Sequence, residues 1–186
     1  MAALRTRADA VRNYERVVAA AAEVLAEKGA DAGIPEIAAR AGVGKGTVYR
    51  CFETKEHLIA AVVAERVRWF AEAIEVAAKR PDAWEAFAEL LSDAAERQAS
   101  DCMFAEGLAH GAGLPEVVEA KATMLAAMDG LMARAQAEGR MRRGATSADV
   151  HVLFGGMARM LRAAGNRDPV AWRRYGELVA EAFRAA

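Results

Sequence analysis

Four side chains that can form hydrogen bonds with nucleic acid lie within six consecutive positions of the sequence. They are Lys45, Thr47, Tyr49 and Arg50. Arginine and threonine can read base edges in the major groove of DNA, while lysine and tyrosine reach phosphate oxygens. If a helix presents these four residues outward, it has the chemistry needed to enter the major groove.

The surrounding pattern predicts the elements that would position these side chains. Two short helices are expected at 34–41 and 45–52, with glycines in the turn between them, which is the helix-turn-helix arrangement. Packing of the two helices requires Ile37, Val43, Val48 and Phe52 on the inner side. A long helix over 54–79, with Thr54 as its N-cap, is expected to connect this unit to the rest of the chain.

The whole chain is predicted to be all-α. Of its 186 residues 47 are alanine, about a quarter, and β-branched and aromatic residues are sparse. Four prolines precede or open apolar-periodic segments, as they do at helix starts. Further helices are expected at 9–28, 82–99, 101–110, 115–138, 147–164 and 169–185. We assign residues 1–57 to a helix-turn-helix domain and residues 58–186 to a second helical domain.

Charge and composition exclude several classes of function. The formal net charge is −1, so any role with nucleic acid must depend on a local group of residues. Cys51 and Cys102 cannot form a disulfide framework, and His57, His110 and His151 lack the spacing of a metal site, so no cofactor is expected. A polar, basic start without a leader and no apolar run of about 20 residues predict a cytoplasmic protein.

The segment 42–47 resembles the phosphate loop of small nucleotide kinases, which would indicate an enzyme. The motif G-x-x-x-x-G-K-[ST] would require a glycine where Ala39 stands, and a buried strand before it. The preceding residues are helical in pattern, so we expect no enzyme. A helical protein-interaction module that does not bind DNA stays open as an alternative. A redox role for Cys102 also stays open, because Asp101 and Met103 suggest a helix start there.

Residues from about Arg12 to Val62 resemble the DNA-binding domain of TetR-family transcriptional regulators. The matching segments are EKGAD at 27–31, EIA at 36–38, AGV at 41–43, GTVYRCF at 46–52 and TKEHL at 54–58. The resemblance implies an all-helical homodimer whose N-terminal domains bind a palindromic DNA operator. It also implies a C-terminal helical domain that binds a small ligand and thereby releases the DNA.

The resemblance also assigns roles to single residues. The implied DNA-binding residues are Arg12, Lys45, Thr47, Tyr49, Arg50 and Lys55. Glycine stands at positions 33 and 44, where the family often has a serine or threonine N-cap, and glycine caps less well. Cys51 replaces a ring-bearing residue that is frequent in the family, so one phosphate contact common in relatives is not expected here.

Apolar side chains in the second domain suggest a ligand pocket. The resemblance places a cavity among the connecting helix and the three helices after it, and no cluster of charge in this part of the sequence indicates a charged ligand. We therefore expect a small, largely apolar effector. The candidate lining residues are Trp69, Phe87, Leu91, Phe104, Leu108, Met124 and Met128. For any single one of them, ordinary core packing is the default interpretation.

The last two predicted helices carry much apolar surface, which would either close the core of one chain or form the family's dimer interface. A two-fold dimer fits the expected operator, because one recognition helix reads only a few base pairs. The candidate interface residues are Phe154, Met157, Leu161, Trp172, Tyr175 and Val179. Gly155 and Gly156 would allow close approach of a partner helix. The hypothesis is a repressor in which the effector moves the connecting helix and changes the spacing of the recognition helices.

Overall fold

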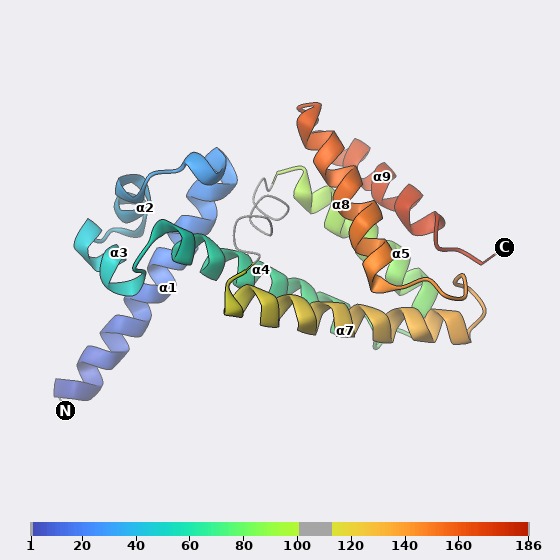
Figure 1. Cartoon of the computed structure of the whole chain (residues 1–186), viewed down its shortest axis with the longest axis horizontal. Helices are drawn as coiled ribbons and strands as arrows, with labels where there is room; N and C mark the ends of the chain where they lie inside the picture. The colour runs from blue at the N-terminus through green and yellow to red at the C-terminus, as the bar shows by residue number, and fades with distance from the viewer. Residues whose placement is uncertain (1, 101–112, 186) are drawn as a thin grey trace. The chain divides into compact units, whose positions relative to one another are not determined.

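The computed structural model describes residues 2–100 and 113–185, and it confirms the all-α prediction. The α-helices are α1 (Ala2–Lys28), α2 (Ile34–Ala41), α3 (Lys45–Cys51), α4 (Lys55–Ala77), α5 (Ala83–Gln98), α7 (Pro115–Ala137), α8 (Ser147–Ala163) and α9 (Pro169–Glu181) (Figure 1). A 3-10 turn, Gly29–Asp31, follows α1. The helix predicted at 101–110, with Cys102, Phe104 and Leu108, lies outside the described residues. Among the described residues, β-structure is limited to one isolated bridge between Met141 and Arg184.

The described residues form two compact units. The first holds residues 2–65 together with 113–118, and the second holds 66–100 together with 119–185. The helices α4 and α7 each contribute residues to both units. Among the described residues, none of the helices combines the length and hydropathy that a bilayer span requires.

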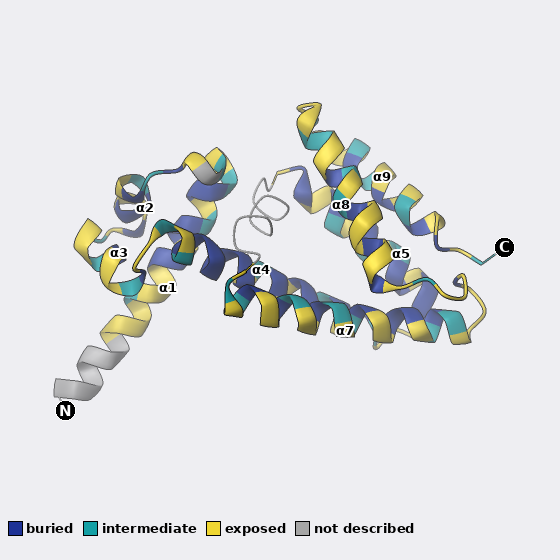
Figure 2. Ribbon diagram, viewed as in Figure 1, coloured by how far each residue is buried: buried dark blue, intermediate teal, exposed yellow. Residues whose placement is uncertain are grey.

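The first unit is built from α1 packed against both α2 and α3. The predicted inner side of the helix-turn-helix is present, because Ile37, Val48 and Phe52 are buried and Val43 is half-buried. Figure 2 shows exposed residues along α3, on the side turned away from this core. The burial of these apolar side chains fixes which face of α3 is left for other contacts.

The predicted helix starts agree with the structure. Pro115 and Pro169 open α7 and α9, and Pro35 stands in the first turn of α2. Thr54 precedes α4, and its hydroxyl accepts a hydrogen bond from the backbone N–H of His57 at 3.2 Å. The Thr54 hydroxyl thus satisfies one of the backbone N–H groups that a helix start leaves without partners, while proline itself has no N–H group that would need a partner.

The start of α8 carries a capping box that was not predicted. The hydroxyl of Thr146 accepts from the backbone N–H of Asp149 at 3.3 Å, and the Asp149 carboxylate accepts from the backbone N–H of Thr146 at 2.9 Å. Hydrogen bonds from the Thr146 hydroxyl and backbone lower the pKa of Asp149 below its ordinary value. The charged form of Asp149 therefore supports this helix start.

In the second unit, α9 packs closely along α5. The contact depends on Gly176, where a Cβ would lie 2.8 Å from the Cβ of Ala95 and 2.9 Å from the carbonyl oxygen of Leu91. No larger residue fits at this position unless α5 moves. Trp84 and Trp172 are both fully buried in this unit. The indole N–H of Trp172 donates to the backbone oxygen of Asn166 at 3.0 Å, so its polar atom is satisfied.

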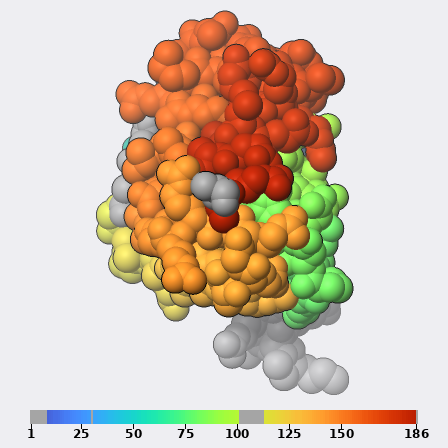
Figure 3. All heavy atoms as spheres, turned by 90° about the vertical axis from the view of Figure 1, so that its right-hand side faces the viewer, coloured from blue at the N-terminus to red at the C-terminus, as the bar shows by residue number. Residues whose placement is uncertain are grey.

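Two helix boundaries differ from the predictions. The first helix begins at Ala2 rather than Asp9, because alanine and arginine continue a helix well and no glycine or proline interrupts them. The last helix ends at Glu181 rather than 185, because the residues after it pair with the loop between α7 and α8. Arg142 N–H donates to the oxygen of Phe183 at 2.8 Å, and Ala185 N–H donates to that of Arg140 at 2.9 Å. Figure 3 shows these terminal residues, in red, against the orange loop.

Candidate nucleic-acid interface

The outer face of α3 carries the four side chains that the sequence singles out. Tyr49 is 54% exposed, Lys45 and Arg50 are exposed, and Thr47 is half-buried. Gly46 leaves open space beside them, since nothing lies within 4 Å of a Cβ built there. A polar, cationic and sterically open helix face of this kind can approach the edges of DNA bases.

Arg50 and Thr47 are linked on this face. A guanidinium N–H of Arg50 donates to the Thr47 hydroxyl oxygen at 2.9 Å, one helical turn earlier. This contact holds the guanidinium group against the helix and leaves its remaining N–H groups to donate elsewhere. A planar guanidinium held this way is suited to bidentate hydrogen bonding with guanine.

The opposite face of α3 anchors the helix to the first unit. Val48 is buried, and Phe52, which follows the helix, packs its ring against that of Tyr14 from α1 with centroids 5.0 Å apart. Cys51 is half-buried between these positions. Because the anchoring residues come from one side of a short helix, the polar side is held facing outward.

The helix α2 is held to α1 by a group of ion pairs. Arg40 donates to Glu23 at 3.0 Å and to Glu27 at 3.1 Å, and Lys28 pairs with Glu36. The hydrogen bonds from Arg40 lower the pKa of Glu27, and those to Glu27 and Glu23 raise the pKa of Arg40. These charged side chains are exposed, so their ion pairs contribute little to the free energy of unfolding. We assign them the role of orienting α2 against α1.

The two remaining predicted DNA-binding residues lie outside α3. Lys55 is half-buried at the first position of α4. Arg12 is exposed on α1 and forms an ion pair with Asp9 three residues earlier. Arg12 would have to exchange this partner for a phosphate, so its contribution to DNA affinity is reduced by the lost ion pair.

The structure also bears on the kinase alternative. Of the segment 42–47, residues 42–44 join α2 to α3 and residues 45–47 begin α3, so a helix precedes the segment where a phosphate loop requires a buried strand. In the part of the chain that the structure describes, no group of histidine, cysteine or acidic residues could hold a metal ion.

A groove of about 590 Å³ lies between α4 and α5 in the second unit. Trp69, one of the predicted ligand-binding residues, lines it and is 45% exposed; Val76, which was not predicted, is 64% exposed. The guanidinium group of Arg97 stacks on the Trp69 ring at 4.0 Å from the centroid. The volume suits a small molecule.

Four of the other predicted ligand-binding residues lie outside this groove, and Phe104 and Leu108 are not among the described residues. Phe87 and Leu91 are fully buried, and Met124 and Met128 are also buried. These four side chains are part of the core and none of them lines the groove, so a ligand-binding role for them stays a prediction. Spacing alone could not separate the two cases, because a core stripe and a pocket stripe share one helical period.

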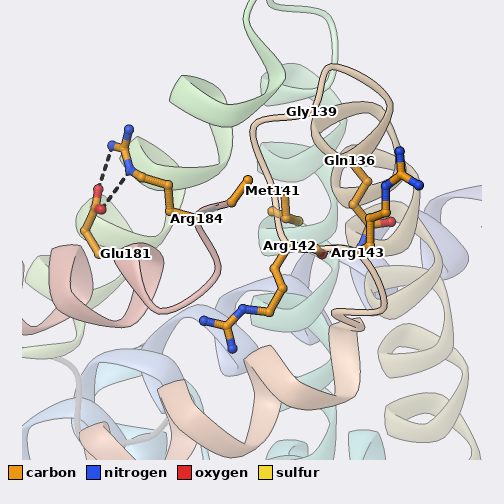
Figure 4. A pocket seen from close by; sticks show the side chains of 8 residues that line it. Gln136, Gly139, Met141, Arg142, Arg143, Glu181 and Arg184 are labelled. Carbon is orange, nitrogen blue, oxygen red and sulfur yellow. Dashed lines mark hydrogen bonds and ion pairs between the residues drawn. The ribbon is translucent and has the colours of Figure 1, made fainter.

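A second pocket, of about 630 Å³, lies beside the loop between α7 and α8 (Figure 4). The amide of Gln136 donates to the backbone oxygens of Arg142 and Ala145 at 3.2 Å and 2.9 Å, which holds the loop. Arg184 makes two hydrogen bonds of 2.7 Å to Glu181 and turns away from Arg142. The polar groups of this pocket thus bond mainly to each other and do not converge on one point.

The predicted interface residues of α8 and α9 differ in how far they are buried. Trp172 and Phe154 are buried within their own chain, and Met157 and Leu161 pack against the Trp172 core. Val179 is half-buried, and Tyr175 is exposed. The large exposed apolar side chains on these two helices are Val152, Leu153, Met160, Val170, Tyr175 and Leu178. Of the described residues other than the helix's own backbone, none lies within 4 Å of a Cβ built at Gly155 or Gly156.

Comparison with known proteins agrees with this geometry. Residues 17–62 match the family model described as bacterial regulatory proteins, tetR family. A search of curated proteins finds no significant match. Among solved structures, a TetR transcription regulatory protein from Mycobacterium vanbaalenii is 34% identical, with a TM-score of 0.61 over 88% of this chain and 99% of that one.

Two further solved structures have similar folds. A TetR transcriptional regulator from Streptomyces coelicolor is 26% identical, with a TM-score of 0.68 over 93% of this chain and 99% of that one. The transcriptional regulator FadR from Bacillus subtilis, solved in complex with stearoyl-CoA, is 23% identical, with a TM-score of 0.66 over 90% of this chain and 97% of that one.

Proposed function

Because the chain belongs to the TetR family of DNA-binding transcriptional regulators, we propose that it is a repressor released from a palindromic operator by a small, largely apolar effector. The observation that carries the DNA-binding part is the outer face of α3. This face presents Lys45, Tyr49 and Arg50 to solvent, while Val48 on the opposite side anchors the helix.

A dimer follows from the family and from the size of this face. Seven residues of α3 can reach only a few base pairs, so one subunit reads one half-site. In a two-fold dimer the second recognition helix reads the other half-site about one helical turn away. Both recognition helices must bind their half-sites at the same time. An effector can therefore control DNA binding by changing the distance between the two helices.

We expect the affinity of the purified protein for its operator to fall steeply with salt. Lys45 and Lys55 of both subunits face phosphates in the proposed complex, so the slope of log K against log[salt] should be about −4 or steeper. The measurement is fluorescence anisotropy with the DNA fragment upstream of its own coding region, at 50 to 300 mM salt, with a random duplex of equal length as control. Equal, salt-independent affinity for both duplexes would instead favour a protein-interaction module.

For the dimer interface we propose the exposed apolar face of α8 and α9. Met160 is 69% exposed on α8 and Leu178 is 52% exposed on α9, and neither is needed to complete the core of its own chain. Gly155 and Gly156 lie on α8 with open space around them, which suits close approach of a partner helix. The α8 and α9 helices of two subunits would then form a four-helix interface.

We assign the effector site to the groove between α4 and α5. It is lined mostly by apolar side chains, and it offers the exposed ring of Trp69 and the exposed side chain of Val76. The stearoyl-CoA complex of Bacillus subtilis FadR is consistent with an apolar ligand in this fold. A molecule bound along α4 would favour a state in which this helix shifts and the spacing of the recognition helices changes.

We expect an apolar fluorescent probe, 1-anilinonaphthalene-8-sulfonate, to bind this groove. The substitution Trp69→Ala should weaken its binding about tenfold, because it removes an aromatic surface worth ~1.4 kcal/mol of contact. Fluorescence titration measures the affinity, and Val118→Ala, which shortens an equally exposed apolar side chain outside the groove, is the control. If both variants bound the probe like the wild type, the groove would not be the site.

A further inference from the structure

Arg16 on α1 contacts the turn that joins the two helices of the helix-turn-helix. One of its guanidinium nitrogens, Nη2, donates to the backbone oxygen of Ala41 at 2.7 Å and lies 3.3 Å from that of Gly42. Both oxygens stand at the C-terminal end of α2, where the helix leaves carbonyl groups without intrahelical partners. A cation at this end also interacts favourably with the helix dipole.

The conformation of the turn between α2 and α3 leaves space for the side chain of Arg16. Gly42 is left-handed, with φ of 64°, and its N–H donates back to Ala38 and Ala39, while the N–H of Val43 donates to Ala38 at 3.0 Å. A Cβ at Gly42 would lie 2.9 Å from Nη2 of Arg16. Position 42 therefore favours glycine because of its left-handed backbone conformation, and a larger residue there would displace the guanidinium group of Arg16.

The start of α3 has little else to define it. Its N-cap is Gly44, which has no side chain to accept a hydrogen bond from the helix N-terminus. In the first turn of α3, Thr47 N–H donates to the Gly44 oxygen at 2.8 Å, and the side chain of Val48 is buried. Val48 and Phe52 anchor the inner face of α3, and the firmness of residues 42–44 contributes to the direction in which the helix leaves the turn.

We propose that Arg16 is a positioning residue for DNA recognition, which fixes the turn and hence the direction of α3 without touching DNA. With it, side-chain contacts of α1 reach each part of the helix-turn-helix: α2 through Arg40, the turn through Arg16, and the end of α3 through Tyr14. The proposal rests on the proposed DNA-binding function. Arg16 lies far from the recognition helix in the sequence, yet the proposal gives it an effect on the specificity of DNA binding.

The test compares Arg16→Ala with Arg12→Ala, an exposed arginine one turn earlier on α1. We expect R16A to weaken binding to the upstream fragment about tenfold, as much as one mismatched base pair does. Its affinity for a random duplex and its salt slope should be unchanged. R12A, which removes a predicted phosphate contact from each subunit, should weaken both duplexes and reduce the slope by about 2 per dimer.

Amide hydrogen exchange of the protein without DNA supplies a readout that does not depend on DNA binding. We expect faster exchange at Val43 and Thr47 in R16A and intermediate rates in Arg16→Lys, with exchange in α5 unchanged as evidence of an intact fold. Unchanged exchange at the turn, or an R16A salt slope reduced like that of R12A, would overturn the positioning role. Absence of DNA binding by the wild type would count against the proposed function, and the exchange rates would still decide whether Arg16 holds the turn.

Discussion

Replacement of Tyr49 and Arg50 together by alanine is expected to weaken operator binding by a hundredfold or more. Each bidentate contact between arginine and a base contributes about 1–3 kcal/mol, and a dimer loses it twice. Both side chains are exposed on α3, and neither contributes to the buried side that anchors the helix. The double variant should therefore keep its helix content, its melting temperature and its dimer mass. Fluorescence anisotropy with the upstream DNA fragment measures the loss.

A control variant distinguishes the loss of DNA recognition by α3 from the general effect of removing positive charge. Arg142 and Arg143 are two exposed arginines in the loop between α7 and α8, away from the helix-turn-helix in sequence. Their replacement by alanine removes more charge than the α3 variant does, yet operator affinity should change less than about threefold at physiological salt. Equal losses in the two variants would mean that α3 is not the reading element.

Much of the fold could be predicted because local signals and packing agree along this chain. Pro115, Pro169 and Thr54 mark helix starts by their own backbone chemistry, and the structure has helices beginning at or just after each of them. The inner side of the helix-turn-helix was equally predictable. Ile37, Val48 and Phe52 are spaced so that only one arrangement of two short helices buries all three.

The candidate sites were harder to predict. Hydrophobic periodicity shows that a side chain lies on the inner face of a helix, but it does not show whether that face packs against the same chain, a ligand or a second subunit. Trp172 was expected at a subunit interface and instead fills the core of its own chain, while Met160 and Leu178 on the same two helices are exposed. Gly155 and Gly156 suggested close helix contact, yet within the chain the close approach is at Gly176. The role of Arg16 had no sequence signal, because its partners are backbone oxygens 25 and 26 residues away.

The substitutions Met160→Glu and Leu178→Glu together are expected to convert the dimer into monomers and to weaken operator binding by a hundredfold or more. Four carboxylates would be introduced into the proposed apolar interface, where each would lose hydration without gaining a partner. Loss of the dimer removes the second half-site contact, and linked sites of this kind typically contribute about 10²–10⁴ in affinity. Analytical ultracentrifugation at micromolar concentration measures the dissociation, and anisotropy measures the DNA affinity.

The chain offers a close control in Val76→Glu. Val76 is 64% exposed on α4, so the change places one carboxylate per chain, against two in the double variant, on a similarly exposed apolar position outside α8 and α9. This variant should remain a dimer with wild-type affinity for the operator in the absence of effector. The monomeric double variant should still bind a single half-site, with about half the salt slope of the dimer, because its own α3 is intact. If M160E/L178E stayed dimeric, the interface would lie on another surface, and the exposed face of α8 and α9 would need a different partner.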